Sequence, residues 1–413
     1  MFNELRSSRT VVGEFSPDLP DHTATVFLGL FNASEYLKSL ESQIASQGPL
    51  FKIIAVDNDS EDSTWANLQS WLDLFPGRVV LARNPLNLGA SGSLYLNEDL
   101  IQTPWFITMH QDDFYKPNHV ETLFNAIDHA DEETICITTE MASLDSAGHP
   151  RPSPPRASWF LPDEDPATIF TSNLRLHNVP YPAAAFRSSV FFQQAVPWES
   201  TAFPDTEWVL RAASLGKFQF VEIETMRYRE NPTSESHSIS SDEKVFGAAL
   251  SLVRVFGGAP FIRLCESIES KDRHLFSRSV LDGVRIRVGE GPTGNFVSTF
   301  ANQQMASTWG YSDSFTNDRL AIAYQHLGAA FPVHLLNRIN DFLQGEPDYK
   351  TQDQASMHPD DVLPQQESKF SISGLVLNLY GRLPTGLRRS TAKLVGAVIR
   401  FLNLKTEWNF KWK

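Results

Sequence analysis

Between Thr25 and about Glu140, short apolar runs alternate with segments whose apolar residues recur every three or four positions. The runs with the length of buried strands cover residues 25–31, 51–56, 79–81 and 105–109. Strands that are separated by helices usually pair in parallel, and both faces of their sheet are covered. The alternation predicts an α/β fold with a Rossmann-like, mostly parallel sheet, flanking helices and a helical region after it.

Further signals place individual elements along the chain. We expect a helix to begin at Asn32, because Glu35 stands at capping-box spacing from it. Another helix should begin near Pro117, since proline suits a first helical turn. The proline-rich stretch 152–182 predicts an irregular loop, residues 203–215 a helix and residues 218–223 a strand. Apolar residues at helical spacing dominate residues 241–343.

Composition limits the class of protein. The chain has 413 residues, of which 41% are hydrophobic and 20% charged, so it can bury a sizeable core in one large and one smaller domain. Its two cysteines, Cys136 and Cys265, form no spaced framework, which favours a reducing compartment. The first twelve residues lack the apolar stretch of a signal peptide, and no run approaches the ~18 apolar residues of a membrane span.

Basic residues gather at the C-terminal end. From Lys369 onward the chain carries nine Lys or Arg and one acid, Glu407, so this part has a charge of +8 and the rest −22, for a net −14. An acidic body argues against a nucleic-acid partner. Residues 371–413 also carry Trp408, Trp412 and many Leu and Val, a pattern typical of amphipathic segments on an anionic membrane surface. Docking on the acidic body of the protein is the alternative.

Polar residues follow each predicted strand. In an open α/β sheet, ligands bind outside the carboxyl ends of the strands. An Asp57 at such an end can accept hydrogen bonds from a nucleobase or ribose, and Gly89 and Gly92 permit close approach of the backbone to a ligand. The adjacent Asp112 and Asp113 repel each other, and a divalent cation removes that cost. Hard carboxylate oxygens favour Mg²⁺ or Mn²⁺, whereas a solvated acidic turn is the alternative.

Three segments together resemble the family 2 glycosyltransferases of the GT-A fold. They are residues 56–64 (Val-Asp-Asn-Asp-Ser-Glu-Asp-Ser-Thr), 84–92 (Asn-Pro-Leu-Asn-Leu-Gly-Ala-Ser-Gly) and 110–113 (His-Gln-Asp-Asp). The resemblance covers roughly residues 25–240. It implies a nucleotide-sugar donor, with donor-binding residues at Asn32, Asp57, Asp59, Arg83, Asn87, Gly89, Gly92 and Gln111. It also implies a metal at Asp112, with Asp113 beside it, although His110 stands where the family's motif has its first Asp.

The resemblance also points to acid–base residues farther along. Residues 204–208 (Pro-Asp-Thr-Glu-Trp) are similar to the family's helix start that carries the general base, which places the base at Asp205. A helix N-cap role is the alternative for Asp205, and Glu207 is the fallback base. Residues 228–237 resemble a loop that often supplies a metal-binding His, so His237 is a further candidate ligand, with an exposed surface His as the alternative.

The resemblance thus implies an inverting, metal-dependent transfer of a sugar from a nucleotide diphosphate to a glycan or lipid-linked acceptor in surface polysaccharide synthesis. We expect an N-terminal extension (1–24), a glycosyltransferase domain (25–240), a helical domain (241–344), a flexible linker (345–370) and a basic tail (371–413). The protein should be cytoplasmic and peripherally bound to the inner face of the membrane. Two alternatives are a non-catalytic glycan-binding or assembly protein of the same fold, and a nucleotidyltransferase. The second would need a basic Gly-rich loop where this chain has residues 32–35.

Overall fold

A computed structural model describes residues 2–20, 23–48, 50–145, 149, 165–175, 179–194, 203–229 and 241–311. The chain divides into two compact units, 1–331 and 332–413, and all described residues belong to the first. The predicted linker and basic tail, and also His237, therefore lie outside the described residues.

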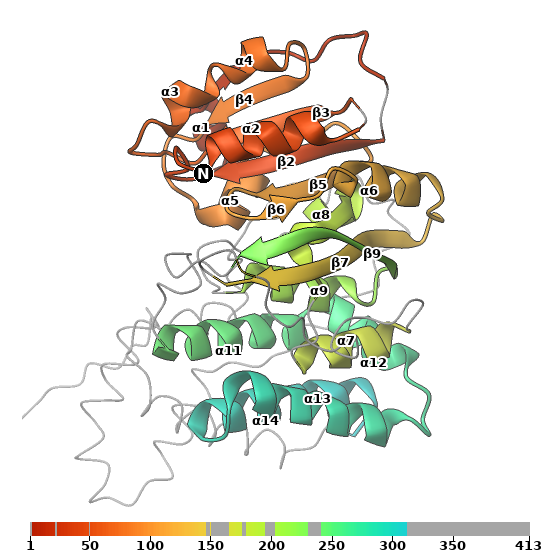
Figure 1. Ribbon diagram of the computed structural model, residues 1–413. Coiled ribbons are helices and arrows are strands. Elements are labelled where there is room, and N and C mark those ends of the chain that lie inside the picture. Colours follow the sequence, from red (N-terminus) through yellow and green to blue (C-terminus); the bar gives the residue numbers. More distant parts are fainter. Residues whose placement is uncertain are drawn as a thin grey trace, which may run out of the picture. The chain divides into compact units, whose positions relative to one another are not determined.

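The described strands form one mixed sheet of nine, in the order β1-β4-β3-β2-β5-β8-β7-β9-β6 (Figure 1). The neighbours β4, β3, β2 and β5 are parallel, as are β7 and β9, whereas the remaining pairs are antiparallel. The bounds are β1 (Thr10–Val12), β2 (Ala24–Leu30), β3 (Lys52–Asp57), β4 (Val79–Arg83), β5 (Trp105–His110), β6 (Phe114–Tyr115), β7 (Thr134–Leu144), β8 (Ala184–Arg187) and β9 (Lys217–Arg229).

The four predicted strands of the parallel half are confirmed to within two residues at each end. Their side chains alternate between the two faces. On one face, residues such as Leu28, Ile53 and Ile107 pack in a single buried cluster with α2 (Leu37–Ser46), α3 (Thr64–Leu68), α4 (Trp71–Leu74) and α6 (His119–Asp128). Burying each such side chain contributes about 1.5–3 kcal/mol.

Aromatic rings fill the opposite face. Phe106 of β5 lies 4.9 Å from Phe191 of α8 (Ser188–Gln193) and 5.5 Å from Phe186 of β8, measured between ring centroids. The ring of Trp208 on α9 (Pro204–Ala212) stacks on Phe191 at 4.9 Å, and α5 (Gly89–Leu96) adds Tyr95 to the cluster. Helices therefore flank both faces, as the alternation predicted.

One helix prediction and one loop prediction are wrong. The helix expected to start at Asn32 starts at Leu37, because Asn32 adopts a left-handed conformation with φ 47° and uses its side chain to bind the neighbouring loop. The stretch expected to be an irregular loop contains the buried helix α7 (Pro166–Leu174), whose N-cap Asp165 accepts bonds from the amides of Ala167 and Thr168. The helix expected near Pro117 is α6, which begins two residues later at His119.

The predicted helical region contains α11 (Ser241–Gly257), α12 (Ala259–Ser267), α13 (Arg273–Val288) and α14 (Pro292–Thr308). Its α13 packs closely on α7, since a Cβ at Gly283 would meet the Cβ of Leu174 at 2.5 Å. None of the described helices alone is long and apolar enough to cross a bilayer. Lys244–Gly257 and Ala259–Ser267 qualify only as a pair, with a bend of 60° between them.

Candidate active site

Asp57 ends β3 with its carboxylate fully buried. Its Oδ1 accepts a bond from the Ser60 amide at 3.2 Å, and its Oδ2 lies 3.2 Å from Nε of Arg83. Burial raises the pKa of Asp57, although the Ser60 bonds and the Arg83 charge oppose that shift. A carboxylate held this way has a fixed position at the carboxyl edge of the sheet.

Arg83 also binds the acidic loop that follows β3. Its Nη2 donates to the carbonyl of Ser60 at 3.1 Å and lies 3.7 Å from Oδ1 of Asp59, which takes a left-handed conformation with φ 62°. The structure thus brings Asp57, Asp59 and Arg83 together, as the sequence implied. The guanidinium places one positive charge beside two carboxylates of the loop.

Asn32 and Gln111 link strand ends. The Gln111 side chain pairs with the backbone of Phe31 as a neighbouring strand would. Its Oε1 accepts from the Phe31 amide at 2.8 Å, and its Nε2 donates to the Phe31 carbonyl at 3.0 Å. Asn32 accepts from the Glu61 amide at 2.9 Å. Both predicted donor-binding residues lie at the carboxyl edge, where their side chains hold the loops after β2, β3 and β5 in register.

The loop after β4 is shaped by amides. Asn87 Oδ1 accepts from Nδ2 of Asn58 at 2.7 Å and from the amide of Gly89 at 2.9 Å. Gly89 has φ 67°, a conformation that side chains disfavour, and it begins α5. Gly92 is buried one turn later. The predicted donor loop therefore packs directly on the loop after β3.

Asp112 and Asp113 follow β5 but differ in environment. Asp113 is 2% exposed, and its Oδ1 accepts from the Arg229 amide at 2.9 Å, which fastens the turn to β9. Burial raises the pKa of Asp113 well above its usual range, with the Asp112 charge adding to the shift and the Arg229 bond opposing it. Asp112 is partly exposed. It is the more accessible carboxylate of the pair.

The pair is suited to a hard cation. In the part of the chain that the structure describes, no three His, Cys, Asp or Glu side chains gather as a complete metal site. Mg²⁺ is commonly held by one or two carboxylates together with phosphates of the substrate, and two carboxyl groups stand at this strand end. The Oδ2 atom of Asp113 is buried, accepts no hydrogen bond there and lies 3.8 Å from Nδ1 of His110. The residues present therefore fit a metal that shares its ligands with a diphosphate.

Asp205 lies in the first turn of α9, near the same strand end. The N-cap of α9 is Phe203, so the N-cap alternative for Asp205 is wrong. Desolvation lowers the pKa of His110, while the charges of Asp112 and Asp205 both oppose that shift. The predicted metal ligand and the predicted base therefore both act on the charge of His110, the last residue of β5.

Asp205 also lines a small pocket. The pocket is bounded by Asn173 of α7, Tyr181, and the α9 residues Asp205, Thr206 and Val209, with Val179 beside them. Asn173 is buried and its Oδ1 accepts no hydrogen bond within the described residues. Sequence reasoning missed Asn173 and Tyr181, because nothing in their local pattern sets them apart.

Arg287 is a second residue that sequence reasoning missed. It reaches from α13 to the end of α7, where its Nε donates to the Leu174 carbonyl at 3.2 Å and its Nη2 donates to that of Asn173. Burial lowers the pKa of Arg287 to about 10, and the Asp205 charge opposes the shift. The helical region thus places a cation near the predicted base, from 82 positions farther along the chain.

Glu207, the fallback base, is fully buried. Its Oε1 accepts from Nε and Nη2 of Arg211 at 3.0 and 2.6 Å, and its Oε2 lies 3.8 Å from Arg254 of α11. A carboxylate enclosed between two guanidinium groups is poorly placed to take a proton from a substrate. The geometry favours Asp205.

Comparison with known proteins bears on the first half of the chain. Residues 25–192 match the family described as Glycosyl transferase family 2, which confirms the resemblance. No curated protein matches the chain.

Among solved structures, the chain is similar to S. aureus TarS 1-349 in complex with UDP-GlcNAc, with 10% identity, 71% of this chain and 92% of that chain covered, and a TM-score of 0.47. It is also similar to the mannosyltransferase PcManGT from Pyrobaculum calidifontis in complex with GDP-Man and Mn²⁺. There the identity is 13%, the coverage 79% and 90%, and the TM-score 0.42.

Proposed function

We propose that this protein is an inverting glycosyltransferase that moves a sugar from a nucleotide diphosphate to a glycan or lipid-linked acceptor in the presence of Mg²⁺ or Mn²⁺. The observation that carries the proposal is that Asp205 lines a pocket with Tyr181, whose carbonyl accepts from the Thr108 hydroxyl of β5 at 3.0 Å, while Asp112 follows the end of the same strand. Two carboxylates from distant parts of the chain at one edge suit a reaction that needs both charge neutralisation and a base.

The donor lies across the loops after β3, β4 and β5 in this proposal. Asp57 accepts from the nucleobase, and Gly89 and Gly92 let the backbone approach the sugar diphosphate. Asp112 and Asp113 would hold the metal, which stabilises the charge that develops on the departing diphosphate. His237 remains a predicted further ligand.

Asp205 acts on the acceptor. An acceptor hydroxyl oxygen attacks the anomeric carbon, the bond between that carbon and the diphosphate oxygen breaks, and the hydroxyl proton moves to the Asp205 carboxylate. A single displacement of this kind inverts the anomeric centre.

The test is a transfer and hydrolysis assay with UDP-, GDP-, dTDP- and CDP-sugars and Mn²⁺. We expect turnover of one donor class, loss of turnover in EDTA, and loss of turnover together with weaker Mn²⁺-dependent donor binding in Asp112→Ala. Asp128→Ala removes an exposed carboxylate from α6 and should behave as wild type. Activity that persists in EDTA and in Asp112→Ala contradicts the metal assignment. Glycan binding without turnover of any donor favours the non-catalytic alternative.

A membrane setting is a further part of the proposal. The charge of +8 from Lys369 onward and the nearby Trp408 and Trp412 support binding of residues 371–413 to the inner face of an anionic membrane, where a lipid-linked acceptor resides. Binding to anionic vesicles should weaken with salt and disappear on deletion of residues 371–413, while transfer to a soluble acceptor analogue persists. Trp408→Ala with Trp412→Ala should weaken binding even at low salt. If the full-length protein does not bind anionic vesicles, the proposed membrane association is wrong.

A further inference from the structure

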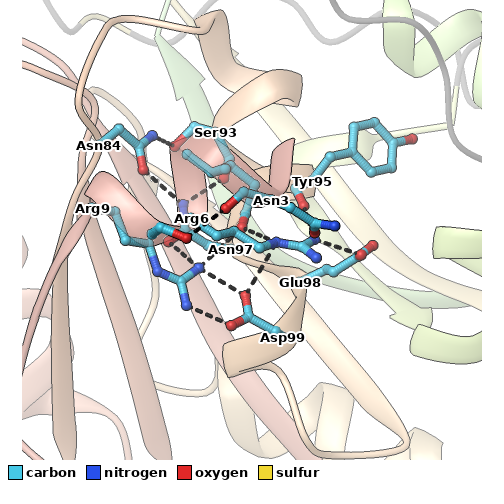
Figure 2. A network of polar contacts seen from close by, with 11 residues as sticks. Asn3, Arg6, Arg9, Asn84, Ser93, Tyr95, Asn97, Glu98 and Asp99 are labelled. Carbon is cyan, nitrogen blue, oxygen red and sulfur yellow. Dashed lines mark hydrogen bonds and ion pairs between the residues drawn. The ribbon is translucent and has the colours of Figure 1, made fainter. Parts of the chain in front are cut away.

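The N-terminal segment joins the sheet and binds the end of α5. Its helix α1 (Phe2–Ser8) is followed by β1, which pairs antiparallel with β4 so that Thr10 faces Arg83. Figure 2 shows Arg6 and Arg9 of this segment reaching the residues that end α5. The last carbonyls of a helix have no partner within the helix, and cations are favoured there.

Arg6 and Arg9 both bind this helix end and its flanking carboxylates, but only one of them reaches a side-chain amide. Arg6 donates to the carbonyls of Leu96 at 3.0 Å and Tyr95 at 3.1 Å, and to Glu98 at 2.6 Å. Arg9 donates to the Leu96 carbonyl at 3.0 Å and to both carboxylate oxygens of Asp99. Only Arg9 also donates to the side chain of Asn97, at 3.3 Å.

A chain of side-chain amides continues from Asn97, and we call Asn97, Asn84, Asn58 and Asn87 the asparagine relay. Asn97 Nδ2 donates to Asn84 Oδ1 at 2.9 Å, and Asn84 Nδ2 donates to Asn58 Oδ1 at 2.8 Å. Asn58 Nδ2 donates to Asn87 Oδ1 at 2.7 Å, and that oxygen also accepts from the Gly89 amide. Figure 2 shows the first step of the relay.

Every link in the relay points the same way. Each amide accepts from the preceding member through its oxygen and donates to the next through its nitrogen, so the bonds polarise one another. Asn58, Asn84 and Asn97 are buried, where a lost partner leaves a polar atom without water to replace it. An unbroken series of hydrogen bonds therefore connects Arg9 with Gly89, where α5 begins.

We propose that Arg9 is a positioning residue for the donor loop of residues 87–89, acting through the asparagine relay, and that the N-terminal segment is thereby part of the donor-binding apparatus. The inference rests on the proposed function for the nature of the ligand. The hydrogen bonds of Arg9 go to Leu96, Asn97 and Asp99, none of which is a predicted donor-binding residue. Its effect on binding is therefore indirect.

Arg6→Ala is the matched control for Arg9→Ala, since both remove a guanidinium from the same helix end but only Arg9 contacts the relay. The first readout is amide hydrogen exchange of residues 87–89 in the protein without ligand. We expect faster exchange there in Arg9→Ala and wild-type exchange in Arg6→Ala. Arg9→Gln, which keeps one amide donor, should give a smaller shift in the same direction and serves if Arg9→Ala does not fold.

The second readout is the affinity of UDP and GDP with Mn²⁺, measured by calorimetry. For the nucleotide that the wild type binds, Arg9→Ala should weaken affinity about tenfold, the size of one lost hydrogen bond, and Arg6→Ala should leave it unchanged. Equal effects of the two variants, or unchanged exchange at residues 87–89 in Arg9→Ala, would overturn the inference. If the wild type binds neither nucleotide, the proposed donor class fails, and the exchange measurement still decides the role of Arg9.

Discussion

The two sides of the candidate site are built from different chemistry. On one side, the asparagine relay of neutral amides fixes the loops after β3 and β4, and its buried members bond to one another. On the other side, which we call the carboxylate cluster, His110, Asp112, Asp113 and Asp205 surround the end of β5, and burial or neighbouring charge shifts the pKa of His110 and of Asp113.

The two kinds of side chain suit different tasks: amides fix the shape of a loop, and titratable groups take part in chemistry. Neutral amides bond in the same way across the physiological pH range, so a loop fixed by them keeps its shape. Carboxyl and imidazole groups with shifted pKa values are typical of sites where protons or metals are handled. The amides that fix the loop after β4 therefore keep their charge, whereas the groups at the end of β5 can change theirs.

The largest expected effect lies in the carboxylate cluster. Asp205→Asn keeps the volume of the side chain but cannot accept a proton, so transfer should fall about 10²–10⁴-fold while donor affinity changes little. Single-turnover rates and calorimetry measure the two quantities. If Asp205→Asn transfers sugar at a near-normal rate and folded Glu207→Gln does not, the general base is Glu207 and not Asp205.

The next effect is on stability beneath the cluster. Glu207→Gln leaves the guanidinium groups of Arg211 and Arg254 without their shared carboxylate, and breaking a buried ion pair should lower the free energy of unfolding by about 3 kcal/mol. Urea titration provides the value. Glu222→Gln on the exposed side of β9 is the control and should change stability by less than about 0.5 kcal/mol. A Glu207 variant as stable as this control would show that the buried pair contributes nothing.

A smaller effect is expected in the relay. Asn84→Ala removes the partner of Asn58 and Asn97 in a buried site, which should cost about 2 kcal/mol of unfolding free energy. Because no member of the relay titrates, the loss should be the same at pH 5.5 and pH 8. A loss that depends on pH would mean that the two sides are not chemically separate.

The last effect comes from outside the site and depends on pH. Burial lowers the pKa of His119 to about 3. As pH falls below about 6.5, His119 therefore becomes protonated in the unfolded chain but stays neutral in the folded protein. This contribution to stability is present above pH 6.5 and is lost at about 1.4 kcal/mol per pH unit as pH falls toward 3.

Replacing this residue isolates its share of the acid sensitivity. His119→Phe should flatten the dependence of the unfolding free energy between pH 6.5 and pH 5, and the exposed His129→Gln should not. Identical pH profiles for wild type and His119→Phe would contradict the assignment.

The sequence allowed local features to be predicted but not their distant partners. Strands such as Lys52–Asp57 were predicted because a short apolar run between polar residues is typical of a buried strand. Asp205 was placed correctly at a helix start by its neighbours in the sequence. Antiparallel β8, only four residues long, carries no such signal.

Partners that lie far apart in the chain escaped prediction for a physical reason. Arg9 meets Asn97, Arg287 meets the end of α7, and Asp113 accepts from the Arg229 amide, which is 116 positions away. Each of these bonds forms because packing brings the two groups together, and nothing in either local sequence identifies the partner. The predicted roles of Asn32 and Gln111 did not include their hydrogen bonds to neighbouring loops, for the same reason.

The pairing of β1 with β4 has a practical consequence for aggregation. Val79, Val80 and Leu81 give β4 an apolar, strand-prone sequence, and β1 covers the open side of that strand with three exposed residues of its own. A protein that lacks residues 1–12 would present the uncovered hydrogen-bonding edge of β4 to other molecules, a template for intermolecular pairing. Poor solubility of such a variant would then come from a bare strand, and would say nothing about Asp112 and Asp205, which the variant keeps.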